Sequence, residues 1–307
     1  MRWENAICYS GYRSGQSPVI QVFPSYKQVK EDLLILKKNW KLIRLYDCTE
    51  HAETVLKVIR NEQLDIKVML GAHLAAEQNN DRCPWGGIYP EYELELNRRA
   101  NEDQVNRLIA LSREYEKEIF CVSAGNEATV DWTDHLVPVE KVLGYVQKIK
   151  GNIDQPVTFC ENYVPWQEKL KPLAAVVDFI SLHTYPVWEY KQIGDALAYT
   201  IENYNSVAAV YPDKQVVITE AGWTTRSNGR GIHPENANHE LQEIYYNALM
   251  EWSKQKGILT FVFEAFDEEW KGSDEPSEPE KHWGLFTVDR KPKKVMEKLY
   301  PELSKHS

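Results

Sequence analysis

The sequence predicts an α/β fold of the (β/α)8 TIM-barrel type, because short apolar runs alternate with amphipathic stretches along the whole chain. Eight runs of apolar and β-branched residues have the character of buried parallel strands. No glycine-rich phosphate turn follows the first run, which disfavours the competing doubly wound open sheet. No linker, low-complexity stretch or charge block divides the chain, so we expect residues 1–307 to form a single domain.

The elements follow one another in the order that this fold requires. The predicted strands are Ala6–Tyr9, Leu42–Tyr46, Lys67–Gly71, Ile119–Ala124, Val157–Cys160, Phe179–His183, Val216–Thr219 and Leu259–Phe263. The stretches between them repeat apolar residues at the spacing of an amphipathic helix. The predicted helices are Tyr26–Asn39, Thr49–Asn61, Asn101–Lys117, Val139–Ile149, Lys191–Val210 and Asn236–Lys256.

Three long segments after predicted strands are the places to look for chemistry, which in this fold collects at the C-terminal ends of the strands. They are His73–Ala100 after the third strand, Thr184–Tyr190 after the sixth and Asp267–Trp283 after the eighth. All three are rich in tryptophan, tyrosine and acidic residues. The last contains Pro276 and Pro279, so we expect it to be irregular and exposed.

Composition and charge narrow the class of partner. A net charge of −10 argues against nucleic acid and anionic membranes, which require clustered lysine and arginine. No apolar run approaches the roughly 20 residues that span a bilayer. Ten tryptophans and 17 tyrosines against eight phenylalanines favour rings with a polar edge, which suit a sugar-binding cleft. We therefore expect a neutral polysaccharide or oligosaccharide as the partner, bound by a monomer.

Neither a cofactor nor a metal ion is expected, since His51, His73 and His135 are scattered singly without ligand spacing. The odd number of cysteines and the absence of a CxxC pair favour buried free thiols. The cysteines are Cys8, Cys48, Cys83, Cys121 and Cys160. Residues Met1–Asn5 lack the apolar core of a signal peptide. The compartment is therefore cytoplasmic, or periplasmic or secreted if a signal has been removed.

Two glutamates stand where predicted strands end. Glu127 follows the fourth strand in Ala124-Gly125-Asn126-Glu127, and Glu220 ends the seventh in Thr219-Glu220-Ala221-Gly222-Trp223. A carboxylate at a buried strand end is costly unless it is paired or used. Across the mouth of a barrel the two could face each other at the 5 to 5.5 Å of a retaining glycosidase. Each glutamate alone could be a structural ion pair, but the pair favours catalysis.

Further segments extend this pattern to nearly the whole chain, which resembles glycoside hydrolase family 17, the β-1,3-glucanase family. The resemblance rests on Arg44–Asp47, Gly125–Glu127, Tyr185-Pro186, Thr219–Trp223, Phe263–Glu268 and Glu280–Phe286. It implies a retaining double displacement on a clan A barrel, with Glu127 as acid/base and Glu220 as nucleophile. It also places Tyr46 in the subsite of the reacting sugar. A charged cluster flanking the catalytic pair corresponds to Glu268, Lys271 and Glu280.

Other residues are candidate sugar contacts. Asn126 could hydrogen-bond the hydroxyl beside the reacting carbon, and Tyr185 belongs to a matched segment. Apolar ring faces stack on the C–H faces of glucose, and the tryptophans that directly follow strand ends are favoured for this role. These are Trp188, Trp223 and Trp283. His183 ends the sixth strand, where a supporting, hydrogen-bonded role is expected.

The chain departs from the plant members of the family. They carry Asn-x-Tyr-Pro-Tyr-Phe where this sequence has His183–Trp188, and Gly-Val-Asn-Tyr-Gly where it has Ile7–Gly11. The segment Cys83–Gly87 has no clear plant counterpart. These differences indicate a divergent, bacterial-type member and leave endo or exo action to loop structure, with endo action favoured.

Four functions are compatible with the residues. The leading one is hydrolysis of β-1,3-glucan of the laminarin type. A β-1,3-glucanosyltransferase would use the same two glutamates, with an acceptor sugar in place of water. A glucan-binding barrel without activity has no reason to hold two facing acids. A β-1,4-mannanase or cellulase of the same clan is disfavoured by the Phe263–Glu268 and Glu280–Phe286 segments.

Overall fold

The computed structural model describes residues 1–304 and shows a closed barrel of eight parallel strands in the order β1 to β8. The strands are β1 Asn5–Cys8, β2 Leu42–Leu45, β3 Lys67–Gly71, β4 Ile119–Asn126, β5 Val157–Asn162, β6 Ile180–His183, β7 Val216–Ala221 and β8 Thr260–Val262. The barrel closes where β1 pairs with β8, with Asn5 opposite Thr260. The predicted fold class and all eight predicted strands are therefore confirmed.

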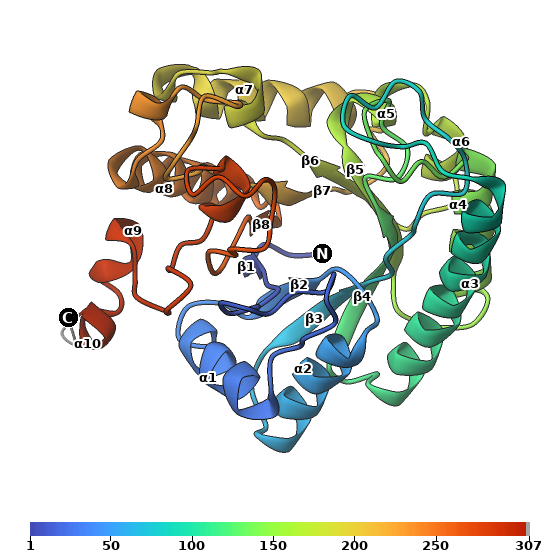
Figure 1. Ribbon diagram of the computed structural model, residues 1–307, viewed down its shortest axis with the longest axis horizontal. Coiled ribbons are helices and arrows are strands. Elements are labelled where there is room, and N and C mark those ends of the chain that lie inside the picture. The colour runs from blue at the N-terminus through green and yellow to red at the C-terminus, as the bar shows by residue number, and fades with distance from the viewer. Residues whose placement is uncertain (305–307) are drawn as a thin grey trace.

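Helices surround the strands, in chain order from α1 at the bottom of Figure 1 through α3 at the right and α7 at the top to α8. Their bounds are α1 Tyr26–Leu36, α2 Glu50–Asn61, α3 Glu91–Glu114, α4 Val139–Lys150, α5 Tyr163–Gln167, α6 Lys171–Ala174, α7 Ile193–Ala208, α8 His239–Lys256, α9 Lys294–Glu297 and α10 Pro301–Ser304. Three short 3-10 helices lie in loops, at Pro186–Glu189, Pro234–Asn236 and Pro279–Lys281. No helix within residues 1–304 has both the length and the apolar composition needed to cross a membrane.

Local sequence explains how the helices begin and pack, and α1 is an example. The Ser25 hydroxyl accepts the Gln28 backbone N–H, and the Gln28 side chain accepts the Ser25 N–H, which forms a capping box. Val29, Leu33 and Leu36 then fall on one face and are buried against the barrel. The short α9 and α10 follow the last strand and close the ring between α8 and α1 (Figure 1).

One predicted boundary is wrong. Helix α3 begins at Glu91, ten residues before the predicted start, so the loop that begins at His73 ends at Pro90 rather than at Ala100. The reason is that the first turns of α3 are rich in charged residues and bury only Leu94 before Asn101, so they lack the apolar spacing that marks a helix. All five cysteines are buried and free, as predicted.

Candidate active site

The C-terminal ends of the strands enclose a pocket of about 590 Å³ that contains both glutamates. A volume of this size is typical of a small-molecule or oligosaccharide site. Seven of the nine predicted substrate-binding residues line it: Tyr46, Asn126, Tyr185, Trp188, Lys271, Glu280 and Trp283. The structure thus brings together residues from the C-terminal ends of four strands, β2, β4, β6 and β8, or the loops that follow them. Glu268 and Trp223 do not line the pocket.

Glu220 lies in β7, and its side chain is only 6% exposed. Oε1 accepts hydrogen bonds from Arg44 Nη1 at 2.5 Å and from the Tyr46 hydroxyl at 2.9 Å. Oε2 accepts one from the Tyr185 hydroxyl and lies 3.4 Å from His183 Nδ1. Burial alone would raise the pKa of this carboxyl, but His183, Arg44 and the Tyr185 hydrogen bond lower it to about 2. Glu220 is therefore a buried carboxylate that stays ionised.

Glu127 is held differently, at the first position after β4. Its backbone is left-handed, with φ of 46°, and its N–H donates to the Cys160 carbonyl at 2.9 Å. The strand is bulged just before it, between Ser123 and Asn126. Gly125 makes this turn possible, since its φ is 149° and an added Cβ would lie 2.8 Å from the Phe159 ring. The bulge aims the Glu127 side chain into the pocket, where it is 32% exposed.

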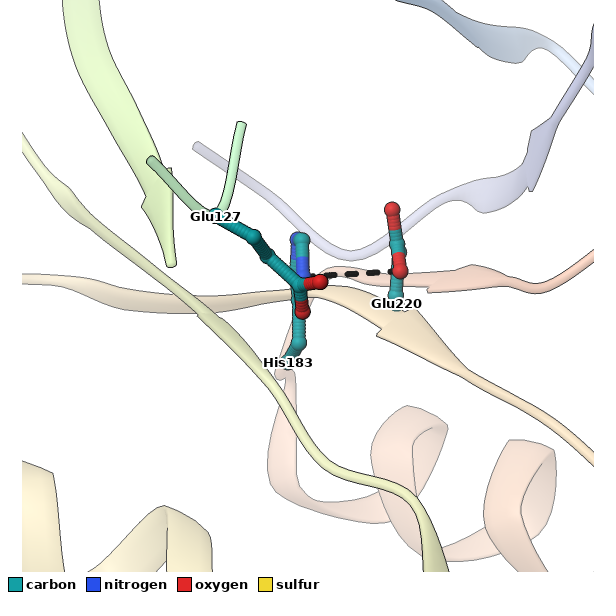
Figure 2. Close-up of side chains that lie close together, drawn as sticks. All are labelled: Glu127, His183 and Glu220. Carbon is teal, nitrogen blue, oxygen red and sulfur yellow. Dashed lines mark hydrogen bonds and ion pairs between the residues drawn. The ribbon is translucent and has the colours of Figure 1, made fainter. Parts of the chain in front are cut away.

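His183, at the end of β6, joins the two glutamates (Figure 2). Its Nδ1 donates to Glu127 Oε1 at 2.8 Å and is the atom that approaches Glu220. Burial alone would lower the pKa of the imidazole, but the charge of Glu220 and hydrogen bonds to Cys160 and Glu127 raise it to about 10. His183 is therefore an imidazolium, in the supporting role expected from the sequence.

The two carboxylates are close enough for retaining chemistry. One oxygen of Glu127 and one of Glu220 lie within 4.8 Å of each other and of His183 Nδ1. Inverting glycosidases separate their carboxyl groups by about 6.5 to 9.5 Å, and retaining ones by about 5 to 5.5 Å. The same three atoms are spaced as metal ligands could be, but the His183 and Arg44 cations already neutralise this pair of acids.

Arg44 is a site residue that sequence analysis did not single out, although it begins a matched segment. The side chain comes from β2, is 2% exposed and does not itself line the pocket. Nη1 donates to Glu220, and Nη2 donates to the Asn126 Oδ1 atom. The guanidinium therefore holds Glu220 of β7 and Asn126 of β4 in a fixed relation through its planar pair of donors. The sequence did carry a signal for Arg44, because a charged residue inside a predicted buried strand needs a partner.

Glu161, at the end of β5, is a second residue that the sequence did not reveal. Its buried carboxyl accepts the Thr129 backbone N–H at 2.9 Å, the Thr129 hydroxyl at 2.6 Å and the Asn162 N–H at 2.7 Å. Burial and the nearby charge of Glu127 raise its pKa to about 7. These bonds hold the turn that follows Glu127.

The predicted charged cluster is present, but the residues that form it differ from those predicted. Lys271 lines the pocket and lies 2.6 Å from Glu264 and 2.7 Å from Glu268, both of which are buried. Glu264 was not predicted, and Glu268 lies behind Lys271 rather than at the surface of the pocket. Glu280 is not part of this ion pair and lies 4.0 Å from Arg230.

The predicted tryptophans divide into wall and core. Trp188 lines the pocket, and the fully buried Trp283 packs behind it with ring centroids 5.6 Å apart. Trp223 is 1% exposed, donates its Nε1–H to the Asn236 carbonyl and packs on Tyr245, so it is a core residue and not a sugar platform. The position of Trp223 in the sequence could not predict its orientation, because the direction of a side chain just beyond a strand depends on the loop.

Comparison with known proteins places this site in context. Residues 6–284 match the BtgE/BtgC glycoside hydrolase domain. The chain is 26% identical over 296 residues to a putative glucan endo-1,3-beta-glucosidase of Aspergillus niger and 24% identical over 291 residues to a glucan endo-1,3-beta-glucosidase of Emericella nidulans. These alignments cover 88% and 87% of this chain but only 40% and 41% of the relatives, so the chain spans well under half their length.

Solved structures show the same architecture. An endo-laminarinase from Formosa is 28% identical and superposes with a TM-score of 0.84 over 99% of this chain and 88% of that one. A β-1,3-glucanosyltransferase from Rhizomucor miehei, solved with laminaritriose, is 18% identical, with a TM-score of 0.74 over 95% and 96% of the two chains. The second likeness is one of fold alone.

Proposed function

The chain belongs to the BtgE/BtgC family of glycoside hydrolases, a family of the glycoside hydrolase 17 type, and on this premise we propose that it hydrolyses β-1,3-glucosidic bonds in laminarin-type glucan with retention of configuration. The names of its Aspergillus and Formosa relatives support the substrate and favour endo action. The observation that carries the proposal is the pair of carboxylates within 4.8 Å in one pocket, one enclosed by donors and one open. Residues 1–307 would act as a single catalytic domain and as a monomer.

In the first step Glu220 is the nucleophile. Its carboxylate oxygen attacks the anomeric carbon as the bond to the leaving glycosidic oxygen breaks, and Glu127 donates a proton to that oxygen. The product is a covalent glycosyl–enzyme ester with the leaving sugar chain free. Arg44, Tyr46 and Tyr185 orient the attacking carboxylate through the contacts described above.

In the second step Glu127 is the base. It takes a proton from a water molecule, whose oxygen attacks the anomeric carbon from the opposite face, and the ester bond to Glu220 breaks. Two inversions give net retention. The open position of Glu127 suits this role, since water must reach it.

His183 positions Glu127 through a hydrogen bond. The imidazolium holds a proton on Nδ1, 2.8 Å from Glu127 Oε1. Because the pKa of His183 is raised to about 10, the imidazolium keeps this proton at neutral pH and orients the Glu127 carboxyl. The proton that Glu127 gives to the leaving oxygen is the one that it takes from water in the second step of the preceding cycle.

Other pocket residues would bind the sugar. The Oδ1 of Asn126 is occupied by Arg44, which leaves its amide N–H groups to donate to a sugar hydroxyl. Tyr46, Tyr185 and Trp188 form an aromatic wall, and the buried Trp283 supports Trp188 from behind. Lys271, held by Glu268, and Glu280 provide polar contacts at its edge.

A time course with laminarioligosaccharides labelled at the reducing end tests the proposal. We expect only shorter products, released from internal bonds and with β-configured reducing ends in the first minutes by NMR. Products longer than the substrate would instead make the protein a β-1,3-glucanosyltransferase, the activity named for the Rhizomucor neighbour. No turnover on any β-glucan would leave the inactive glucan-binding barrel.

A further inference from the structure

Glu161, at the end of β5, is a buried carboxyl group that lies beside the turn carrying Glu127. Its exposed fraction is 0%. Within residues 1–304 its hydrogen-bond donors are all neutral: the Thr129 N–H, the Thr129 hydroxyl and the Asn162 N–H. Because a buried carboxylate without an opposite charge is costly, its presence at this position indicates a role beyond packing.

The end of β5 holds this turn at two points. The Glu127 N–H donates to the carbonyl of Cys160, and two residues later Thr129 donates its N–H and its hydroxyl to Glu161. The carbonyl of Thr129 in turn accepts a hydrogen bond from Lys169 Nζ at 2.5 Å. The backbone that carries Glu127 is therefore anchored on the carboxyl of Glu161, and a change at Glu161 reaches Glu127 through one short turn.

The charges around Glu127 act in opposite directions. The His183 imidazolium favours the ionised form of Glu127, whereas the first step of the proposed reaction requires Glu127 to hold a proton. Burial and the charge of Glu127 raise the pKa of Glu161 to about 7. Because this repulsion acts on both groups, the charge of Glu161 favours the protonated form of Glu127, and the two carboxyl groups together retain a proton near neutral pH.

We propose that Glu161 is a positioning residue for the acid/base: its carboxyl fixes the turn that carries Glu127, and its negative charge offsets that of the His183 cation so that Glu127 holds a proton. This inference rests on the proposed function, because it takes Glu127 to be the acid/base. Glu161 does not line the pocket, so its replacement changes the charge next to Glu127 without removing a group that the substrate touches.

Other ionisable groups also act on Glu127, and they stay in place when Glu161 is replaced. They come from β6, from β7 and from the loops after β4, β6 and β8: His183, Glu220, His135, Tyr185 and Glu280. The charge that acts on Glu161 is that of Glu127. A change in pH dependence on replacing Glu161 alone therefore reports the interaction of this one pair.

The pH profile of kcat/KM on laminarihexaose tests the inference. In Glu161→Gln we expect the basic limb to move down by about one pH unit, a roughly tenfold loss of kcat/KM above the limb, because the repulsion that keeps a proton on the pair is removed. The acidic limb should stay in place, since it reports Glu220, which is held ionised by other groups. A fall in kcat/KM that is equal at every pH would show that Glu161 is only structural and would overturn the inference.

Two further variants serve as controls. Glu161→Asp keeps the charge, so its basic limb should stay near the wild-type position even where kcat falls, and a limb displaced as far as in Glu161→Gln would contradict the role of the charge. Glu77→Gln removes another buried carboxyl group, which accepts from Asn101 at 2.8 Å and Tyr145 at 2.6 Å and does not line the pocket. Both limbs should be unchanged in Glu77→Gln, and an equal displacement there would also overturn the inference.

Carbon-13 NMR titration of the Glu127 carboxyl, assigned by its loss in Glu127→Gln, gives a readout that needs no turnover. We expect its midpoint to fall in Glu161→Gln, and an unchanged midpoint would overturn the inference while leaving the hydrolase intact. If wild-type protein cleaves no β-glucan, the proposed function fails, whereas a lowered midpoint in Glu161→Gln would still support the coupling of the two carboxyl groups.

Discussion

The ends of β7 and β4 hold the same type of side chain in opposite ways. Glu220 is almost fully enclosed, and its two oxygens meet an arginine, a histidine and two tyrosines. Glu127 projects from a bulged, left-handed turn and is a third exposed, and within residues 1–304 its single charged partner is His183. Enclosure by donors fixes the Glu220 carboxylate as an anion, whereas Glu127 stays open to water, and this contrast supports the proposed division into nucleophile and acid/base.

The largest effect should come from replacing the enclosed carboxylate. Glu220→Gln keeps the shape of the side chain but removes the nucleophile, so we expect kcat to fall on the order of 10⁴-fold or more. No covalent intermediate should be trapped by a slow fluorinated substrate and seen by mass spectrometry. Normal turnover in this variant would contradict the assignment of Glu220.

Replacing Glu127, the more exposed carboxylate, should reduce activity less than replacing Glu220, and an added nucleophile should restore part of the activity. Glu127→Ala removes the general acid and base, and we expect a loss of about 10²- to 10⁴-fold. Substrates with a good leaving group should still form the ester, and added azide should then give a β-glycosyl azide, identified by NMR. An α-glycosyl azide would show that the two glutamates have exchanged roles or that the reaction inverts.

Replacing Arg44 tests how much its ion pair with Glu220 contributes to the stability of the fold. Arg44→Met leaves a buried carboxylate without its closest cation, and we expect a loss of about 3 to 5 kcal/mol in the free energy of unfolding, measured in urea. The double variant Arg44→Met with Glu220→Gln has no such unpaired charge, so it should recover much of that loss. If the two losses simply add, Arg44 does not stabilise the protein through Glu220.

The smallest expected effect is the contribution to stability of His183, which contacts both glutamates, and this contribution depends on pH. Because the pKa of His183 is raised to about 10 in the folded chain, its stabilisation is fully present below about pH 6.5 and is lost as the pH rises through 10. The stability difference between wild type and His183→Gln should therefore shrink by roughly 1 to 3 kcal/mol from pH 6 to pH 10. Thermal melts across this range measure it, and a constant difference would mean that His183 is neutral.

Much of this site could be read from short segments of sequence. Both glutamates follow runs of β-branched residues, so their position at the ends of strands follows from the repeating pattern. Lys271 and Glu280 were found by their motifs. Arg44 and Glu161 were missed because their partners, Asn126 and Thr129, are distant in the sequence, and nothing local marks those contacts.

The sequence by itself determined the eight-stranded barrel, the two carboxylates at its mouth and the family, because strand periodicity and strand-end motifs are local properties. Only the tertiary structure decided which way each loop residue points. It turned Trp223 into the core, brought Tyr12 and Trp270 together from the first and last loops, and set one glutamate among four donors. The physical reason is that burial and charge environment arise from residues that meet only when the barrel closes.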